Sequence, residues 1–191
     1  LILFNMELKG VRRKVFEDRY AARDENGNLI EHEPVEMWHR VAKAIASTEK
    51  TEEERATAEK IFYDLLEDFK FVPGGRILSG AGAPGQKTFY NCFVIPSPED
   101  SRGGIMKSVT TMAEIMARGG GVGVNISSLR PKGSYVKGVN GQASGSVSFG
   151  GLYSYVTGLI TQGGSRRGAL MLVLNIDHPD IEPFITCKAE E

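Results

Sequence analysis

The sequence of 191 residues has only two cysteines, one tryptophan and no long hydrophobic run. Two cysteines far apart in the sequence form neither a disulfide framework nor a zinc knuckle. This usage fits a reducing cytosol, so we expect a cytoplasmic protein. Without about 18 consecutive apolar residues, no membrane-spanning helix is expected. The apolar run Leu1–Phe4 is too short for a signal peptide and lacks its cleavage site.

Acidic residues are scarce between Ser101 and Arg167, where Glu114 is the only one. Most of the glycines lie in the same region, and so do these basic residues: Arg102, Lys107, Arg118, Arg130, Lys132, Lys137, Arg166 and Arg167. A cationic, glycine-rich segment in a protein of net charge −1 indicates small phosphorylated ligands. Nucleic acid is not expected as a partner, because no basic stripe follows a helix and no aromatic stacking motif accompanies it.

The residue pattern of the sequence changes near Phe71. This change divides the chain into two predicted domains, residues 1–70 and 71–191. The first domain reads as helical, with a turn at Asn26-Gly27. Thr51 and Glu54 form a capping box, which marks the beginning of a helix. The predicted helices cover Lys9–Arg23, Pro34–Ala46 and the segment from Thr51 to about Phe69.

The second domain alternates between strand and helix patterns. Strands are predicted over Phe89–Ile95, Gly121–Leu129 and Gly168–Ile176, and helices over Ser101–Arg118, Ser146–Thr161 and from Asp180 onward. This alternation predicts an α/β fold with parallel strands and helices on the outside. Three strands cannot close a barrel. The chain begins with Leu1 and ends inside a predicted helix, so we expect a fragment of a longer chain.

One thiol and two glycine-rich loops are the candidates for chemistry. Cys92 lies in an apolar strand, where it is either a buried packing residue or a redox thiol. The loop Gly119–Asn125 leads out of a helix into a strand, so it is not a Rossmann loop. It either ends the helix or lets a ligand approach bare backbone. In the loop Gln162–Gly168, two adjacent arginines exceed what a plain connection requires.

Other polar residues allow simpler interpretations. The basic loop from Arg130 to Lys137 is either solvated or a phosphate site. His32, His39 and His178 lack metal-ligand spacing, so surface or capping roles and no metal site are expected. In the turn that begins with His178, Asp180 is predicted to cap the next helix.

The ordered motifs resemble the large chain of ribonucleotide reductase, most closely its adenosylcobalamin-dependent class II type. They are Asn91-Cys-Phe-Val-Ile-Pro96, Gly119-Gly-Gly-Val-Gly-Val-Asn125, Leu129-Arg-Pro-Lys-Gly133, Ser165-Arg-Arg-Gly-Ala-Leu-Met171 and Asn175-Ile-Asp-His-Pro-Asp180. The resemblance implies an N-terminal helical domain followed by the first strands and helices of a ten-stranded α/β barrel. It implies reduction of ribonucleotides by a thiyl radical, which supplies deoxyribonucleotides for DNA replication.

The resemblance also implies roles for single residues. Cys92 matches a cysteine that reduces the substrate and forms a disulfide with a second cysteine far downstream. The substrate-binding positions match Asn91, Gly121, Gln162 and Arg166, the last two on a loop between effector and substrate base. The positions that bind a deoxynucleoside triphosphate effector match Asp100, Arg130 and Lys137. Cys187 matches no motif and is read as a packing residue.

The implied partners are a ribonucleotide substrate, the effector, a thioredoxin or glutaredoxin type reductant and a second copy of the chain. The helices Ser101–Arg118 and Ser146–Thr161 would form the homodimer. The cofactor would be adenosylcobalamin, bound mostly outside these residues, and the fragment alone would be inactive. Two alternatives remain open, a class I large subunit and a non-catalytic nucleotide-binding sensor. Whether the substrate is a diphosphate or a triphosphate also stays open.

Overall fold

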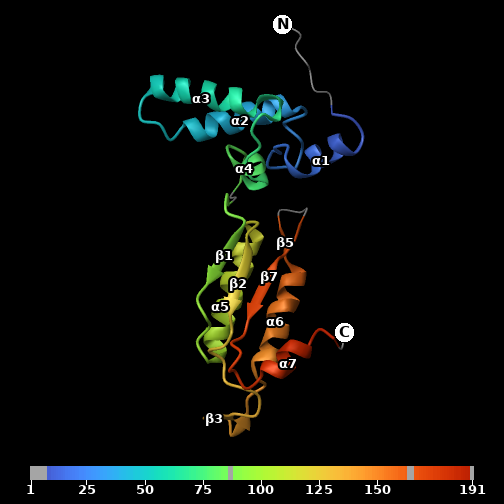
Figure 1. Ribbon diagram of the computed structural model, residues 1–191, viewed down its shortest axis with the longest axis vertical. Helices are drawn as coiled ribbons and strands as arrows, with labels where there is room; N and C mark the ends of the chain where they lie inside the picture. Colours follow the sequence, from blue (N-terminus) through green and yellow to red (C-terminus); the bar gives the residue numbers. More distant parts are fainter. Residues whose placement is uncertain (1–7, 86–87, 163–165, 190–191) are drawn as a thin grey trace. The chain divides into compact units, whose positions relative to one another are not determined.

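The computed structural model describes residues 8–85, 88–162 and 166–189 (Figure 1). The chain divides into two compact units, Leu1–Phe89, here called the helical unit, and Tyr90–Glu191, here called the sheet unit. This division falls later in the sequence than the change of texture at Phe71. The reason is that Leu78 and Ala81 are buried in the same core as Trp38, so the glycine-rich segment after Phe71 packs with the helical unit.

The helical unit contains α1 (Val11–Arg19), α2 (Pro34–Ala46), α3 (Glu52–Leu66), the short 3-10 helix η1 (Glu67–Phe69) and α4 (Gly75–Gly80). The predicted limits of α2 are confirmed, with Pro34 at its first position. The predicted capping box is also confirmed, because Glu54 N–H donates to Thr51 Oγ1 at 3.2 Å and Thr51 N–H donates to the Glu54 carboxylate at 3.0 Å. The sequence did not predict α4, since its glycines favoured a loop.

A buried ion pair ties the parts of the helical unit together. Arg40 on α2 donates from Nε to Glu31 Oε1 at 2.6 Å and from Nη2 to Glu31 Oε2 at 3.0 Å. Glu31 also accepts the N–H of Ala22 at 2.8 Å, and Arg40 donates to the carbonyl oxygen of Leu78 at 2.9 Å. The turn after α1 is therefore bonded to α2, and α2 is bonded to α4.

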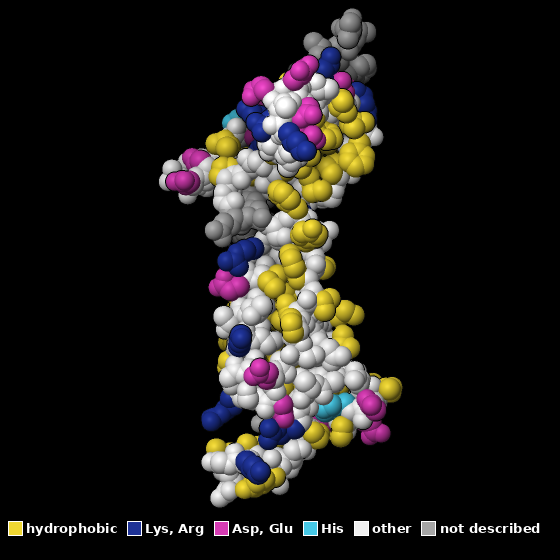
Figure 2. Space-filling model, turned by 90° about the vertical axis from the view of Figure 1, so that its left-hand side faces the viewer, with side chains coloured by type: hydrophobic (Ala, Val, Ile, Leu, Met, Phe, Trp, Pro, Cys, Tyr) yellow, Lys and Arg dark blue, Asp and Glu magenta, His cyan; other side chains and the backbone are white. Residues whose placement is uncertain are grey.

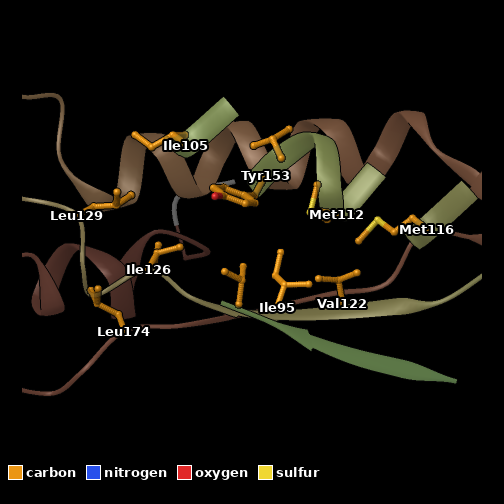
Figure 3. Packing of buried hydrophobic residues seen from close by; sticks show 11 residues of the cluster. Ile95, Ile105, Met112, Met116, Val122, Ile126, Leu129, Tyr153 and Leu174 are labelled. Atoms are coloured by element: carbon orange, nitrogen blue, oxygen red, sulfur yellow. The ribbon is translucent and has the colours of Figure 1, made fainter. Parts of the chain in front are cut away.

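The sheet unit is built on three parallel strands in the order β1-β2-β7, which confirms the predicted parallel α/β arrangement. The strands are β1 (Cys92–Ile95), β2 (Gly121–Asn125) and β7 (Leu170–Val173); the helices are α5 (Arg102–Ala117), α6 (Ser146–Leu159) and α7 (Ile181–Thr186). The long helices α5 and α6 both cover the same face of the sheet (Figures 1 and 3). Three strands leave the barrel open, as expected of its first part.

The core of the sheet unit lies between this face and the two long helices (Figure 3). It includes Ile95, Val122 and Val124 from the strands, Ile105, Met112 and Met116 from α5, and Tyr153 from α6. Because side chains alternate along a strand, the other residues point to the opposite face. That face is open, with Val94 90% and Met171 66% exposed. On the visible surface of this unit, hydrophobic side chains gather in patches among a larger polar and backbone area (Figure 2).

Two short hairpins lie at opposite ends of the sheet unit (Figure 1). Strand β3 (Tyr135–Val136) pairs with β4 (Gly141–Gln142), and β5 (Thr161–Gln162) pairs with β6 (Arg166–Arg167). The sequence predicted loops for these segments, except that it assigned Thr161 to the end of a helix. In the described parts of both units, no helix combines the length and the apolar character needed to cross a membrane.

Candidate functional site

The thiol of Cys92 lies on the open face of the sheet, at the first residue of β1. Cys92 is a free, exposed cysteine, so it is not the buried packing residue that one interpretation predicted. Gly121 lies opposite it in register on β2, and a Cβ at Gly121 would be 3.4 Å from Cys92 Sγ. The N–H of Gly121 donates to the carbonyl oxygen of Asn91 at 2.8 Å. The structure therefore brings Asn91, Cys92 and Gly121 together.

The orientation of Cys92 follows from the packing on the other face of β1. Phe93 points toward the helices, and its ring closely approaches Gly120, where a Cβ would be 2.7 Å from Phe93 Cε2 and 2.7 Å from Ile115 Cγ2. A side chain at position 120 would force these groups apart. Since Phe93 and Ile95 point to the core, Cys92 points away from it.

The hairpin of β5 and β6 carries Gln162 and Arg166, which are partners in its register. The residues between them lie outside the described chain. Gly168 follows the hairpin, and its N–H donates to the carbonyl oxygen of Ile160 at 3.1 Å. Next in sequence, the carbonyl oxygen of Ala169 accepts the N–H of Val122 at 2.9 Å. The hairpin thus adjoins the end of the sheet where Cys92 and Gly121 lie.

Asp100 and Arg130 form a second group at the other end of the sheet. Arg130 Nε donates to Asp100 Oδ2 at 2.7 Å, and its Nη1 donates to the carbonyl oxygen of Tyr135 at 3.3 Å. Both paired side chains are about a third exposed, at 35% and 36%. Lys137 is exposed and follows β3 directly. An ion pair this exposed contributes only about 0–1 kcal/mol, so an anionic ligand can replace it.

A cavity of about 220 Å³ lies beside Asp100, between the segment 95–99 and α5. Its lining includes Pro98 and Glu99 from the segment and Lys107, Ser108 and Thr111 from the helix. The lining of this cavity is partly polar and partly apolar.

The two groups are separated by the length of α5. This helix of 16 residues begins two positions after Asp100 and spans about 24 Å. Met116, near its other end, is 3.3 Å from the Cβ that Gly168 would have. A single chain therefore does not bring Asp100 and Arg130 to the hairpin that carries Gln162 and Arg166.

The structure differs from the sequence prediction in the turn that contains His178 and Asp180. His178 is buried, at 7% exposed, so a surface role is wrong. Asp180 precedes α7 but its side chain makes no cap bond to that helix. Its carboxylate accepts the N–H groups of Ser146 and Lys132 instead. No local pattern in the sequence could have revealed these distant partners. Within residues 8–85, 88–162 and 166–189, no three potential metal ligands cluster.

The structure thus combines a helical unit with a parallel α/β unit that carries an exposed thiol on the open face of its sheet. Residues 90–191 match the ribonucleotide reductase barrel domain, and residues 7–86 match the ribonucleotide reductase all-alpha domain. The chain belongs to the ribonucleotide reductase large-chain family, which confirms the resemblance of the motifs.

Several proteins named as reductases are similar to this chain. It is 40% identical over 179 residues to a vitamin B12-dependent ribonucleoside-diphosphate reductase of Mycobacterium tuberculosis, covering 92% of this chain and 25% of that protein. A protein of the same name from Thermoplasma acidophilum is 42% identical over 131 residues, 68% of this chain and 17% of that protein. A ribonucleoside-diphosphate reductase subunit alpha of Helicobacter pylori is 31% identical over 175 residues, 92% of this chain and 21% of the relative. The chain spans at most a quarter of these relatives.

Proposed function

We propose that this chain is the N-terminal part of an adenosylcobalamin-dependent ribonucleotide reductase and contributes one reducing thiol. The observation that carries the proposal is the exposed Cys92 thiol above the bare backbone of Gly121, on the open face of the sheet. The relatives named vitamin B12-dependent support this type of reductase. The substrate would be a ribonucleotide, and a diphosphate is supported by the same names.

The thiol would supply part of the reducing power. Replacing the 2′ hydroxyl of the ribose by hydrogen requires two electrons and releases water. Two thiols can supply them, with loss of two hydrogens and formation of one disulfide. Cys92 would be one, and the other would come from a distant part of the full-length protein. Cys187 is not suited, because it is half-buried on the turn after α7 and its thiol donates to the carbonyl oxygen of Phe184 at 3.1 Å.

Gly121 and Asn91 would form the substrate wall beside this thiol. Without a side chain at position 121, a ribose can approach both the thiol and the strand backbone. After each turnover the disulfide must be reduced again. A thioredoxin or glutaredoxin type dithiol in the cytoplasm would carry out this exchange.

Adenosylcobalamin would generate the radical that begins the reaction. His178 uses both ring nitrogens in hydrogen bonds within the protein, so it is not free to ligate the cobalt, and the cofactor site would lie mostly outside the described residues. To the chemistry this chain would contribute the reducing thiol and the substrate wall, and other parts of the full-length protein would hold most of the cofactor.

The group of Asp100, Arg130 and Lys137 would bind a deoxynucleoside triphosphate effector. Two cations on the same loop can make charge-assisted hydrogen bonds to phosphates. Asp100 would accept a hydrogen bond from the deoxyribose hydroxyl once Arg130 turns to the phosphates, and the adjoining cavity of about 220 Å³ would take part of the nucleoside.

A homodimer would connect this effector group with the hairpin of Gln162 and Arg166. Helices α5 and α6 both begin near the Asp100 end and finish near the hairpin end. If two copies pair these helices about a two-fold axis perpendicular to them, the helices run antiparallel. The hairpin of one copy then lies near Asp100 and Arg130 of the other. Exposed side chains on these helices, such as Tyr155 at 69% and Leu159 at 63%, support such a contact.

Replacement of the thiol tests the proposal. In the full-length protein, Cys92→Ser should abolish repeated turnover with a dithiol reductant and leave effector binding unchanged, because serine cannot form the disulfide. Cys187→Ser is the matched control and should retain turnover. The measurement is deoxyribonucleotide formed per enzyme over many cycles. Repeated turnover by Cys92→Ser at the parent rate would refute the role of this thiol.

A further inference from the structure

A buried carboxylate lies between the two ends of the loop that carries Arg130 and Lys137. Asp180 is only 7% exposed. Its Oδ2 accepts the N–H of Ser146, the first residue of α6, at 2.8 Å. The N–H of Lys132, near the other end of the loop, donates to Oδ1 at 3.1 Å and to Oδ2 at 3.2 Å. A single side chain thus holds both ends of the loop.

His178 makes further hydrogen bonds at the beginning of the same loop. The N–H of Asp180 donates to His178 Nδ1 at 3.0 Å, so Nδ1 is an acceptor and the ring hydrogen is on Nε2. Nε2 donates to the carbonyl oxygen of Leu129 at 2.8 Å. Ser146 Oγ donates to the same oxygen at 3.3 Å. Leu129 directly precedes Arg130, so the backbone is fixed on both sides of this arginine.

The end of the loop is shaped to receive the carboxylate. Gly145, at the N-cap position of α6, has no side chain to cap the helix, and Asp180 takes that role from a distant part of the sequence. A negative charge is favourable at a helix N-terminus. Gly145 has φ +87°, and a Cβ there would be 2.7 Å from Asp180 Oδ2 and 2.8 Å from the backbone nitrogen of Lys132. Only glycine permits these three groups to meet.

We propose that Asp180 is a positioning residue for nucleotide binding, which holds the loop 130–145 in the conformation that Arg130 and Lys137 need to meet a triphosphate. This proposal rests on the proposed effector site. Because the loop is already fixed, little chain entropy is lost when the nucleotide binds. Asp180 also lies next to α7, whose Ile181 and Phe184 pack on the core. The loop is therefore anchored to the segment that follows β7 as well as to its own neighbours.

The test compares dTTP binding by the parent and by Asp180→Asn in the full-length protein, well below the unfolding temperature. In asparagine one carboxylate oxygen becomes an NH2 group, which cannot accept the N–H that it faces, and the negative charge is lost. We therefore expect about tenfold weaker binding, corresponding to roughly one lost hydrogen bond to a charged group. Hydrogen exchange of the Lys132 and Ser146 amides should accelerate, while exchange in β2 and α5 stays unchanged. Asp177→Asn, an exposed neighbour, is the control and should behave like the parent.

Measuring Arg130→Ala in parallel distinguishes failure of the positioning role of Asp180 from failure of the proposed effector site. If Arg130→Ala binds dTTP like the parent, the effector site itself is wrong. If Arg130→Ala weakens binding but Asp180→Asn does not, the site stands and the positioning role is refuted. Faster exchange throughout the sheet unit of Asp180→Asn would mean that Asp180 only maintains the fold, which also overturns the proposal.

A measurement on the parent protein keeps the proposal testable if Asp180→Asn does not fold. Adding dTTP should leave exchange of the Lys132 and Ser146 amides nearly unchanged, since both are already bonded to Asp180. A strong slowing on addition of dTTP would show that the nucleotide itself orders the loop, and the positioning role would be refuted.

Discussion

Gly121 lies opposite Cys92 in register and has no side chain that could cover the exposed thiol. A Cβ at Gly121 would make only an ordinary van der Waals contact with Cys92 Sγ, at 3.4 Å, but a larger side chain would cover the sulfur. The packing leaves room for a small substituent here, so we expect the bare backbone to matter for access to the thiol rather than for packing.

We therefore predict that Gly121→Val slows alkylation of Cys92 by iodoacetamide by about tenfold or more, because the isopropyl group covers the sulfur. The rate is measured by mass spectrometry of the Cys92 peptide. Gly123→Val is the matched control on the same face of β2, where a Cβ has only Val94 at 3.9 Å and a backbone oxygen at 4.0 Å nearby. Equal alkylation rates in the two variants would contradict the predicted role of Gly121.

A second prediction for single residues concerns the contribution of the buried ion pair of Arg40 and Glu31 to stability. Glu31→Gln leaves the Arg40 charge buried without its partner, which should lower the free energy of unfolding of the helical unit by about 3–5 kcal/mol. Urea unfolding followed by Trp38 fluorescence reports on this unit alone, because Trp38 is the only tryptophan. Glu17→Gln, which removes one partner of the more exposed Arg13, should cost about 1 kcal/mol or less. A similar loss in both variants would show that burial of the pair is unimportant.

Among the elements, the beginning of α2 should respond to acid. The N–H groups of His32 and Glu33 donate to the Glu36 carboxylate and hold the pKa of Glu36 below its ordinary value. Since the folded pKa is lower than the unfolded one, the contribution of Glu36 is complete above the unfolded pKa of about 4.3 and is lost as pH falls through the folded pKa.

The prediction is that the stability of the helical unit falls less steeply on acidification in Glu36→Gln than in the parent. Urea unfolding at several pH values between about 3 and 6 measures the slope. Glu25→Gln, in the exposed turn after α1, should keep the slope of the parent. Parallel slopes for Glu36→Gln and the parent would mean that the bonds to the Glu36 carboxylate add nothing.

Elements with strong local signals were predicted, and elements that depend on distant partners were not. The capping box of Thr51 and the proline of α2 act within one turn of helix, so the sequence contains them fully. Helix α4 was not predicted because its glycines favoured a loop, and its Leu78 is buried in the core of the helical unit. His178 bonds to Leu129, 49 positions away, which no local pattern can indicate. The grouping of Asp100 with Arg130 was predicted from the family resemblance, not from local chemistry.

For the whole molecule, dimerisation is the main prediction. Full-length protein with a saturating deoxynucleoside triphosphate should sediment as a dimer. Leu159→Glu should weaken the dimer, because the substitution places a charge on an exposed apolar position of α6. Ile61→Glu changes a comparably exposed apolar residue on α3 and is the control. If the Leu159→Glu variant still forms the dimer, the contact lies elsewhere. If the parent stays a strict monomer with effector, the proposed dimer is excluded.

The strand order β1-β2-β7 has a consequence for handling the protein in solution. Among the described residues, each outer strand of this sheet pairs on one side only, and the adjacent open face exposes Val94 and Met171. Unpaired strand edges readily accept strands from other molecules. Isolated chains should thus aggregate through added β-structure as concentration rises, and thioflavin fluorescence should grow with it. In the complete barrel, neighbouring strands would occupy these edges and suppress that aggregation.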